Sequence, residues 1–90
     1  MIRITRIKIF PFDVSTMGKQ LRAFAEVDID DEITIRGIKI IESKSGGLFI
    51  GFPSQKAKDG KFYDLIVPKN KSIATVIRDR IIDAYQNHLY

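Results

Sequence analysis

The sequence predicts an α+β domain, with an antiparallel sheet of about five strands and one C-terminal helix packed on it (βββββα). Two observations predict this fold. Apolar and polar residues alternate in short segments separated by tight turns, which is typical of antiparallel strands. After residue 72, apolar residues recur at the spacing of a helix. Ninety residues are enough for one domain, so we expect residues 1–90 to form a single unit.

The first predicted strand covers residues 2–10, and its apolar phase slips by one residue midway. Such a slip would turn the following side chains to the other face of the sheet. A β-bulge near Thr5–Arg6 would restore the phase. Pro11 should end the strand because it has no backbone N–H to donate. A polar loop over residues 13–19 follows.

The second and third strands form a predicted hairpin. Residues 21–29 show the cleanest alternation in the chain, with Phe24 on the side opposite the apolar stripe. Asp30–Asp31 supplies the turn. The third strand runs over residues 33–41, and its phase slips at Gly37, which is a natural bulge residue.

Two more strands are predicted at residues 48–52 and 62–67, each ended by a proline. A polar loop over residues 54–61 joins them, and we expect the two strands to pair with each other. Gly51, between two apolar residues, indicates that another strand, the helix or a ligand approaches the sheet closely there.

The C-terminal helix is predicted to begin with Ser72 as its N-cap. Its main apolar stripe contains Ile73, Ile77, Ile81 and Ala84, with Tyr85 beside it. Ile82 and Leu89 fall outside this stripe. Either a curved sheet wraps the helix, or the helix has a second contact, most simply with another copy of the chain.

The residues offer little for catalysis. The only histidine, His88, is close to the C-terminal residue, and the acidic residues 28–32 resemble a solvated hairpin tip more than a cation site. The glycines are not followed by the lysine and helix of a phosphate-binding loop. We therefore expect no enzyme activity, no catalytic residues, no cofactor, no metal and no small-molecule substrate.

The chain contains no cysteine and no apolar run long enough to cross a membrane, so we expect a cytoplasmic protein without membrane partners. Its net charge of +4 is concentrated in one segment. Residues 44–80 hold eight of the fifteen basic residues but only three of the eleven acidic ones. A one-sided basic field attracts polyanions, although it also favours solubility alone.

The candidate nucleic-acid-binding residues are all in this basic segment: Lys56, Lys58, Lys61, Lys69, Lys71, Arg78 and Arg80. If the strands on either side of the 54–61 loop pair, the two groups of lysines lie at opposite ends of a hairpin, ~20 Å apart. That spacing suits contacts along a phosphate backbone. Arg78 and Arg80 are about 200° apart around the helix and cannot share one face.

The stretch Gly47-Leu48-Phe49-Ile50-Gly51-Phe52-Pro53-Ser54, followed by Asp59-Gly60-Lys61-Phe62-Tyr63-Asp64 and by Pro68, resembles the stage V sporulation protein G family. The resemblance covers nearly the whole chain. It implies a small bacterial regulator that binds DNA and RNA as a homodimer, with roles in sporulation, septation, cell division and gene expression. It implies no enzyme and no cofactor.

Three positions depart from the family pattern. Tyr63 stands where family members often carry arginine, Val67 stands where they carry histidine before the proline, and residues 71–73 replace a Gly-Thr-Arg sequence. The basic residues are thus partly relocated to Lys69 and Lys71.

A second function fits the same sequence. Five strands and one helix leave at least one sheet edge uncovered, and natural proteins rarely leave such an edge bare. A symmetric homodimer would cover it. Alternatively, the chain is a protein-interaction module that recruits a partner by strand addition.

Overall fold

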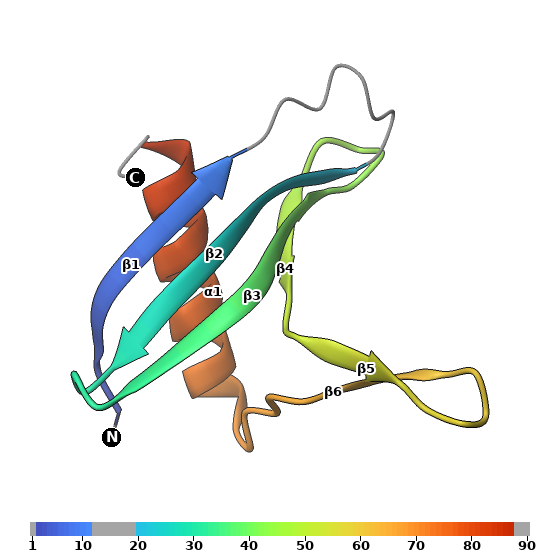
Figure 1. Cartoon of the computed structure of the whole chain (residues 1–90). Coiled ribbons are helices and arrows are strands. Elements are labelled where there is room, and N and C mark those ends of the chain that lie inside the picture. Colours follow the sequence, from blue (N-terminus) through green and yellow to red (C-terminus); the bar gives the residue numbers. More distant parts are fainter. Residues whose placement is uncertain (1, 12–19, 88–90) are drawn as a thin grey trace.

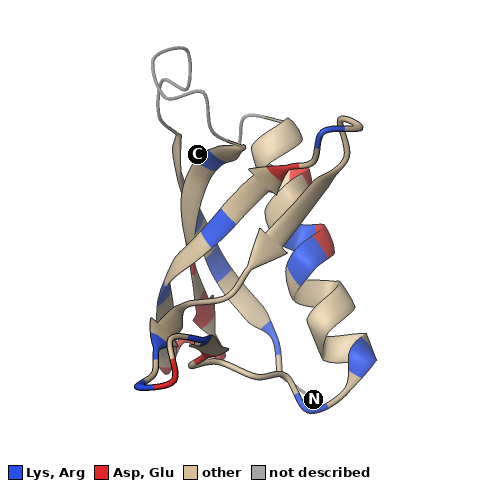
Figure 2. Ribbon diagram, turned by 90° about the vertical axis from the view of Figure 1, so that its right-hand side faces the viewer, with Lys and Arg blue, Asp and Glu red and all other residues tan. Residues whose placement is uncertain are grey.

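The computed structural model describes residues 2–11 and 20–87, and it confirms an α+β fold. A four-stranded antiparallel sheet has the order β1-β2-β3-β4, and a separate two-stranded sheet consists of β5 and β6. The bounds are Ile4–Pro11 for β1, Leu21–Ile29 for β2, Ile33–Glu42 for β3, Leu48–Gly51 for β4, Ser54–Lys56 for β5, Phe62–Asp64 for β6 and Lys71–Gln86 for the single helix α1. Helix α1 lies against one face of the large sheet, so the domain has two layers (Figures 1 and 2).

The core lies between the sheet and α1. Its members are apolar side chains from one face of β1, β2 and β3 and from one stripe of the helix: Ile4, Ile9, Ala23, Ala25, Val27, Ile29, Ile38, Ile40, Ile77, Ile81 and Ala84. The alanines of β2 are small, and the larger core side chains of β1, β3 and α1 pack around them. The helix lies nearest the edge strands β1 and β4, so the sheet curves around it. This curvature accounts for part of the broad apolar arc, in which Ile82 is half-buried. Leu89, the loop at 13–19 and His88 lie outside the described residues.

Both expected bulges are present. The β1–β2 register shifts between Ile4 and Arg6, as the phase slip in β1 predicts. The β2–β3 register shifts where Ala25 pairs with Ile38 and Val27 pairs with Ile35, which leaves two residues of β3 opposite one of β2. Gly37, inside this bulge, has a φ of +80°, a left-handed conformation that a residue without a Cβ adopts without strain.

The predicted pairing of strands four and five is wrong. Within the described part of the chain, strand β4 pairs with β3 alone, and it ends at Gly51, one residue before the predicted end. Pro53 cannot extend a ladder, and the chain then turns into β5, which occupies part of the predicted 54–61 loop. Strand β6 pairs with β5 and ends at Asp64, not at Val67.

The predicted N-cap is also wrong. Helix α1 begins at Lys71, and its N-cap is Asn70. The Asn70 side-chain oxygen accepts hydrogen bonds from the Ile73 backbone N–H (2.9 Å) and from the Ser72 hydroxyl (2.8 Å). Ser72 therefore lies inside the first turn, where its hydroxyl supports the cap instead of forming it. Both side chains are good capping groups, and the sequence alone does not separate two candidates so close together.

Candidate nucleic-acid interface

Most of the candidate lysines belong to the β5–β6 hairpin, which projects from the rest of the domain (Figure 1). Lys56 pairs with Phe62 and Gln55 pairs with Tyr63, so the two strands form a short twisted ribbon. All residues of β5 and β6 except Ser54 are exposed. At the base of the ribbon, the Leu65 backbone N–H donates to the Pro53 carbonyl oxygen (2.7 Å), which closes the hairpin where it leaves the domain.

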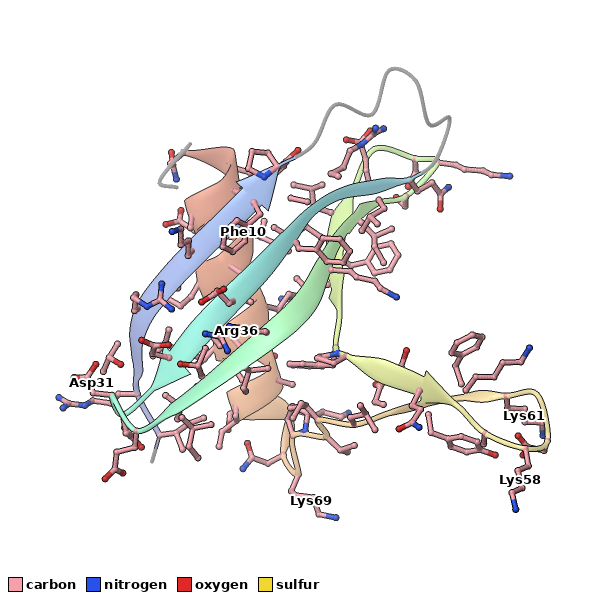
Figure 3. All side chains as sticks on the ribbon, in the orientation of Figure 1. Phe10, Asp31, Arg36, Lys58, Lys61 and Lys69 are labelled. Atoms are coloured by element: carbon pink, nitrogen blue, oxygen red, sulfur yellow. The ribbon has the colours of Figure 1, made fainter. Side chains whose placement is uncertain are left out.

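The turn at the tip of the hairpin is fixed by backbone hydrogen bonds. Ala57 N–H donates to the Lys61 carbonyl oxygen (2.8 Å), and Gly60 N–H donates to the Ala57 carbonyl oxygen (3.0 Å). Gly60 has a φ of +83°, a left-handed conformation that glycine adopts without strain and that is typical of an Asp-Gly turn. These bonds hold Lys58 and Lys61 at the tip, where Figure 3 shows both side chains directed away from the domain.

Asp59 organises this turn from within. Its carboxylate accepts hydrogen bonds from the Lys61 backbone N–H (2.9 Å) and from the Tyr63 hydroxyl (2.7 Å). The Tyr63 bond, and after it the Lys61 bond, lowers the pKa of the Asp59 carboxyl below its ordinary value. The same bond to a carboxylate raises the pKa of Tyr63, with desolvation as a smaller cause. Tyr63, a departure from the family pattern, thus has a structural role in this hairpin.

The hairpin lysines have no acidic partner among residues 2–11 and 20–87. Among the described residues, Lys56, Lys58 and Lys61 take part in no ion pair, although Asp59 is their close neighbour in sequence. The Asp59 oxygens are occupied by the hydrogen bonds of the turn. The ammonium groups are therefore available to an anion from outside.

Lys69 and Lys71 lie at the other end of the hairpin, on either side of the N-cap Asn70. Figure 3 shows Lys69 beside the beginning of α1, well separated from Lys58 and Lys61. The two groups thus have the opposite-end arrangement that the sequence predicts, although the strands that pair are not the predicted ones. Within one chain they form two basic groups, not one continuous patch.

Arg78 and Arg80 differ from the lysines and from each other. Arg78 donates two hydrogen bonds to Asp79 (3.0 Å from Nε and 2.9 Å from Nη2), which compensates its charge. Arg80 is exposed and, in the part of the chain that is described, makes no ion pair. The structure does not bring either arginine together with the hairpin tip.

A group of side chains that was not selected from the sequence lies on the sheet face opposite α1. Phe10, Phe24 and Phe49 are all partly exposed there. The sequence contained a usable signal, because the alternation in residues 21–29 already places Phe24 on the side away from the apolar stripe.

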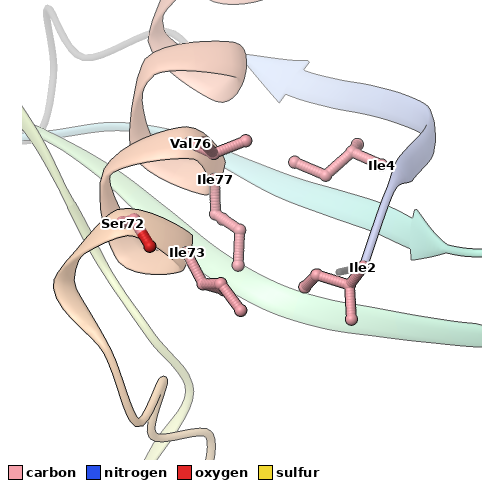
Figure 4. A pocket seen from close by; sticks show the side chains of 6 residues that line it. All are labelled: Ile2, Ile4, Ser72, Ile73, Val76 and Ile77. Carbon is pink, nitrogen blue, oxygen red and sulfur yellow. The ribbon is translucent and has the colours of Figure 1, made fainter.

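An apolar pocket lies between the beginning of β1 and the first turns of α1 (Figure 4). It is lined by Ile2, Ile4, Ser72, Ile73, Val76 and Ile77. No acidic or basic side chain lines it, so it offers no group for proton transfer. Across residues 2–11 and 20–87, no three His, Cys, Asp or Glu residues gather in a way that could hold a metal ion. The described helix is too short and too polar to cross a membrane.

The acidic residues in the last part of β2 and in the turn after it have structural partners. Asp28 accepts hydrogen bonds from Arg6 (2.8 Å from Nε) and from the Thr34 hydroxyl (2.7 Å), and Arg6 also bonds Glu26 (2.7 Å). These bonds lower the pKa of Asp28, with Arg6 as the largest cause and Thr34 next. Asp30 accepts from the Arg3 backbone N–H (2.9 Å). The cluster is a solvated hairpin tip, as the sequence predicts.

The fold and the exposed hairpin place the chain in the class of small α+β domains with projecting basic residues. The residues that line its apolar pocket carry no titratable group. The sequence matches the SpoVG family model over residues 2–87. The chain belongs to the SpoVG family, which confirms the resemblance drawn from its motifs.

Relatives that carry the name septation protein SpoVG span most of this chain. The protein of Bdellovibrio bacteriovorus is 34% identical over 98% of this chain and 77% of its own length. That of Archaeoglobus fulgidus is 33% identical over 96% of both chains. That of Acetivibrio thermocellus is 38% identical over 96% of this chain and 87% of its own. The name of these relatives refers to septation.

Proposed function

We propose that this protein binds DNA or RNA through phosphate contacts, as a homodimer, and regulates gene expression in connection with septation or sporulation. The observation that carries the proposal is the projecting β5–β6 hairpin, whose Lys56, Lys58 and Lys61 form no ion pair with any acidic residue that the structure describes. Unpaired lysines on a projecting ribbon can neutralise phosphates with little cost in desolvation.

Lys69 and Lys71 extend the proposed contact surface. They lie at the base of the ribbon and beside the N-terminus of α1, where the helix dipole also favours negative charge. A backbone that follows the ribbon would meet phosphate contacts at both ends. Arg80 is a weaker candidate because it lies further along α1, and Arg78 is the weakest because Asp79 already compensates its charge.

A homodimer would cover apolar side chains that a single chain leaves in water. Phe62, Leu65 and Val67 are 68%, 59% and 61% exposed on and after β6. Exposed apolar groups so close together mark an interaction surface. Two copies that pack through this region would also bring four basic groups into one assembly, which would lengthen the track for a polyanion.

Strand addition of an unrelated partner is the second candidate. Strand β4 has β3 as its one pairing partner among the described residues, so its other edge offers backbone groups to a further strand. The two functions respond differently to charge. Reversal of Lys56 and Lys58 to glutamate should abolish nucleic-acid binding and leave strand addition at β4 intact.

The test is a binding titration with a labelled oligonucleotide at several salt concentrations. We expect the affinity to fall steeply with salt, by ~0.9 log units per log unit of salt for each duplex phosphate neutralised. Lys58→Gln should reduce this slope by about one phosphate. Arg3→Gln, which removes a charge at the far end of the sheet, is the matched control. Salt-insensitive binding, or no binding at low salt, would overturn the proposal.

A further inference from the structure

The face of the large sheet that points away from α1 is aromatic at one end. Phe10, Phe24 and Phe49 are 41%, 37% and 44% exposed there, on three different strands. An antiparallel sheet with one face on the core usually carries polar residues on its other face. Figure 3 shows Phe10 and Arg36 in front of the sheet, with α1 behind it. An aromatic group of this size on the open face requires an explanation.

The strand register brings these aromatic residues close together. Phe10 pairs with Phe24, Phe24 pairs with Lys39, and Lys39 pairs with Gly51, so these four residues form one row across β1 to β4. Directly opposite residues on one face have Cβ atoms about 5 Å apart. In the next row, Ile41 pairs with Phe49. The rings therefore occupy one surface that spans all four strands, which we call the aromatic face.

Two lysines without ion pairs lie within the aromatic face. The Lys8 ammonium lies 5.3 Å from the centre of the Phe10 ring, and Lys39 lies next to Phe24 in the same row. Within residues 2–11 and 20–87, neither lysine forms an ion pair. Glu26, which lies opposite Lys8 in the β1–β2 register, and Asp28 beyond it are instead matched by Arg6, and Arg36 lies 3.6 Å from Glu26. The aromatic end is thus the positively charged end.

Gly51 makes the edge of the aromatic face shallow. It shares its row with Lys39, so its missing side chain leaves space on the open face and not toward α1. A Cβ at this position would meet the Ile41 Cδ1 atom at 3.6 Å. Because this space lies on the face away from α1, the helix is not the group that approaches the sheet at Gly51. Another strand or a ligand remains. A flat group could therefore reach the sheet beside Lys39 and Phe49.

We propose that the aromatic face binds single-stranded nucleic acid by stacking bases on Phe10, Phe24 and Phe49, while Lys8 and Lys39 hold the adjacent phosphates. Exposed rings that alternate with cations fit unpaired bases, because every base has a flat face and every nucleotide has a charge. A duplex presents its bases only at groove edges, so it cannot stack on this surface. The proposal rests on the proposed function and specifies its ligand class.

A second copy of the chain fits this face less well. The centre of a protein–protein interface is depleted of lysine, and here Lys39 lies between Phe24 and Gly51 in the middle of the row. Packing two such faces together would remove both ammonium groups from water without an acidic partner, which is costly. A polyanion supplies the missing charge.

The experiment measures the affinity of the full chain, at one salt concentration, for three labelled polymers of equal length. These are oligothymidine, an abasic deoxyribose-phosphate chain and a DNA duplex. We expect Phe49→Ala and Phe10→Ala to weaken oligothymidine binding by about fivefold to a hundredfold each, the range measured for loss of one stacked base. Affinity for the abasic chain and for the duplex should not change.

Substitutions at the same site distinguish stacking from simple apolar contact. Phe49→Tyr keeps a ring and should retain wild-type binding, whereas Phe49→Leu should bind as weakly as Phe49→Ala. Ile33→Ala, which removes an exposed apolar side chain at the start of β3, is the matched control and should leave the preference for oligothymidine over the abasic chain unchanged. Because all these side chains are exposed, circular dichroism should show each variant folded.

The alternative outcomes show which of the two proposals fails. If wild type binds oligothymidine and the abasic chain equally, or if Phe49→Leu binds normally, the aromatic face does not stack bases, while binding through the hairpin lysines stands. If no polymer binds at low salt, both proposals fail. If Phe49→Ala halves the mass measured by light scattering and loses all three polymers together, the face is a contact between copies of the chain.

Discussion

The Tyr63 hydroxyl donates a 2.7 Å hydrogen bond to the Asp59 carboxylate, across the tip of the β5–β6 hairpin. The bond joins strand β6 to the turn that carries Lys58 and Lys61. It gives the tip a fixed shape although the hairpin is exposed on both sides. The lysines are thus presented by a rigid turn, which reduces the conformational entropy that a phosphate contact must overcome.

Asp59→Asn should lower the pKa of Tyr63 toward its ordinary value of about 10. The carboxylate raises the pKa of Tyr63 by accepting a hydrogen bond from its protonated hydroxyl, and a neutral amide stabilises the protonated form less. The contribution of this bond to hairpin order is present below pH ~10 and is lost as the pH rises through the raised pKa. A pH titration of the Tyr63 ring signals by NMR measures the shift, with Tyr85 as the internal control. An unchanged Tyr63 pKa would contradict the hydrogen bond.

Asn70→Ala should destabilise the protein by about 1 kcal/mol, because it removes the side-chain oxygen that caps α1. Ser72→Ala should have a smaller effect, since Ser72 only donates to that oxygen. Urea unfolding, followed by circular dichroism, compares the two variants. A larger loss of unfolding free energy for Ser72→Ala than for Asn70→Ala would show that Ser72 is the N-cap, as the sequence predicts.

Asp28→Asn should flatten the loss of stability in acid. In the folded protein, Arg6 and then Thr34 lower the pKa of Asp28 below its unfolded value. Asp28 therefore contributes stability that is fully present above the unfolded pKa of about 4 and is lost as the pH falls through the lower folded pKa. Denaturant midpoints measured from pH 6 down to pH 2 test this, with Asp31→Asn as the matched control. Parallel curves for wild type and Asp28→Asn would contradict the prediction.

Gly46→Ala should destabilise the turn between β3 and β4 by about 1 kcal/mol, whereas Gly47→Ala should not. Gly46 has a φ of +94°, which strains a residue with a Cβ even though nothing lies within 4 Å of the added atom. At Gly47 the added Cβ would make an ordinary contact, 3.5 Å from the Ser43 hydroxyl oxygen. Thermal unfolding of the two variants provides the comparison. Equal losses of thermal stability in the two variants would show that the positive φ of Gly46 is not the cause of the destabilisation.

The sequence predicts most of the main sheet because its strands bury one face. A one-residue slip in β1 or β3 would expose that face, so the phase slips at Thr5–Arg6 and Gly37 had to be bulges, and the register confirms both. The same reasoning failed after Gly51. Strands β5 and β6 bury almost nothing, so no alternation marks where they begin or which strands they join.

The candidate site also has one part that the sequence predicts and one part that only the structure shows. The lysines could be selected from charge alone. Their placement at two ends of a hairpin was predicted from a pairing of residues 48–52 with 62–67 that the structure does not contain. The Asp59–Tyr63 bond and the aromatic face required the structure, because both depend on which residues lie opposite each other across strands.

The separation of the β5–β6 hairpin from the core has an evolutionary consequence. Because its side chains support no other part of the fold, substitutions there can alter charge, length or shape without unfolding the domain. Related chains can therefore keep the turn of this arm and the same scaffold while single exposed positions, such as that of Tyr63, differ and alter what they recognise.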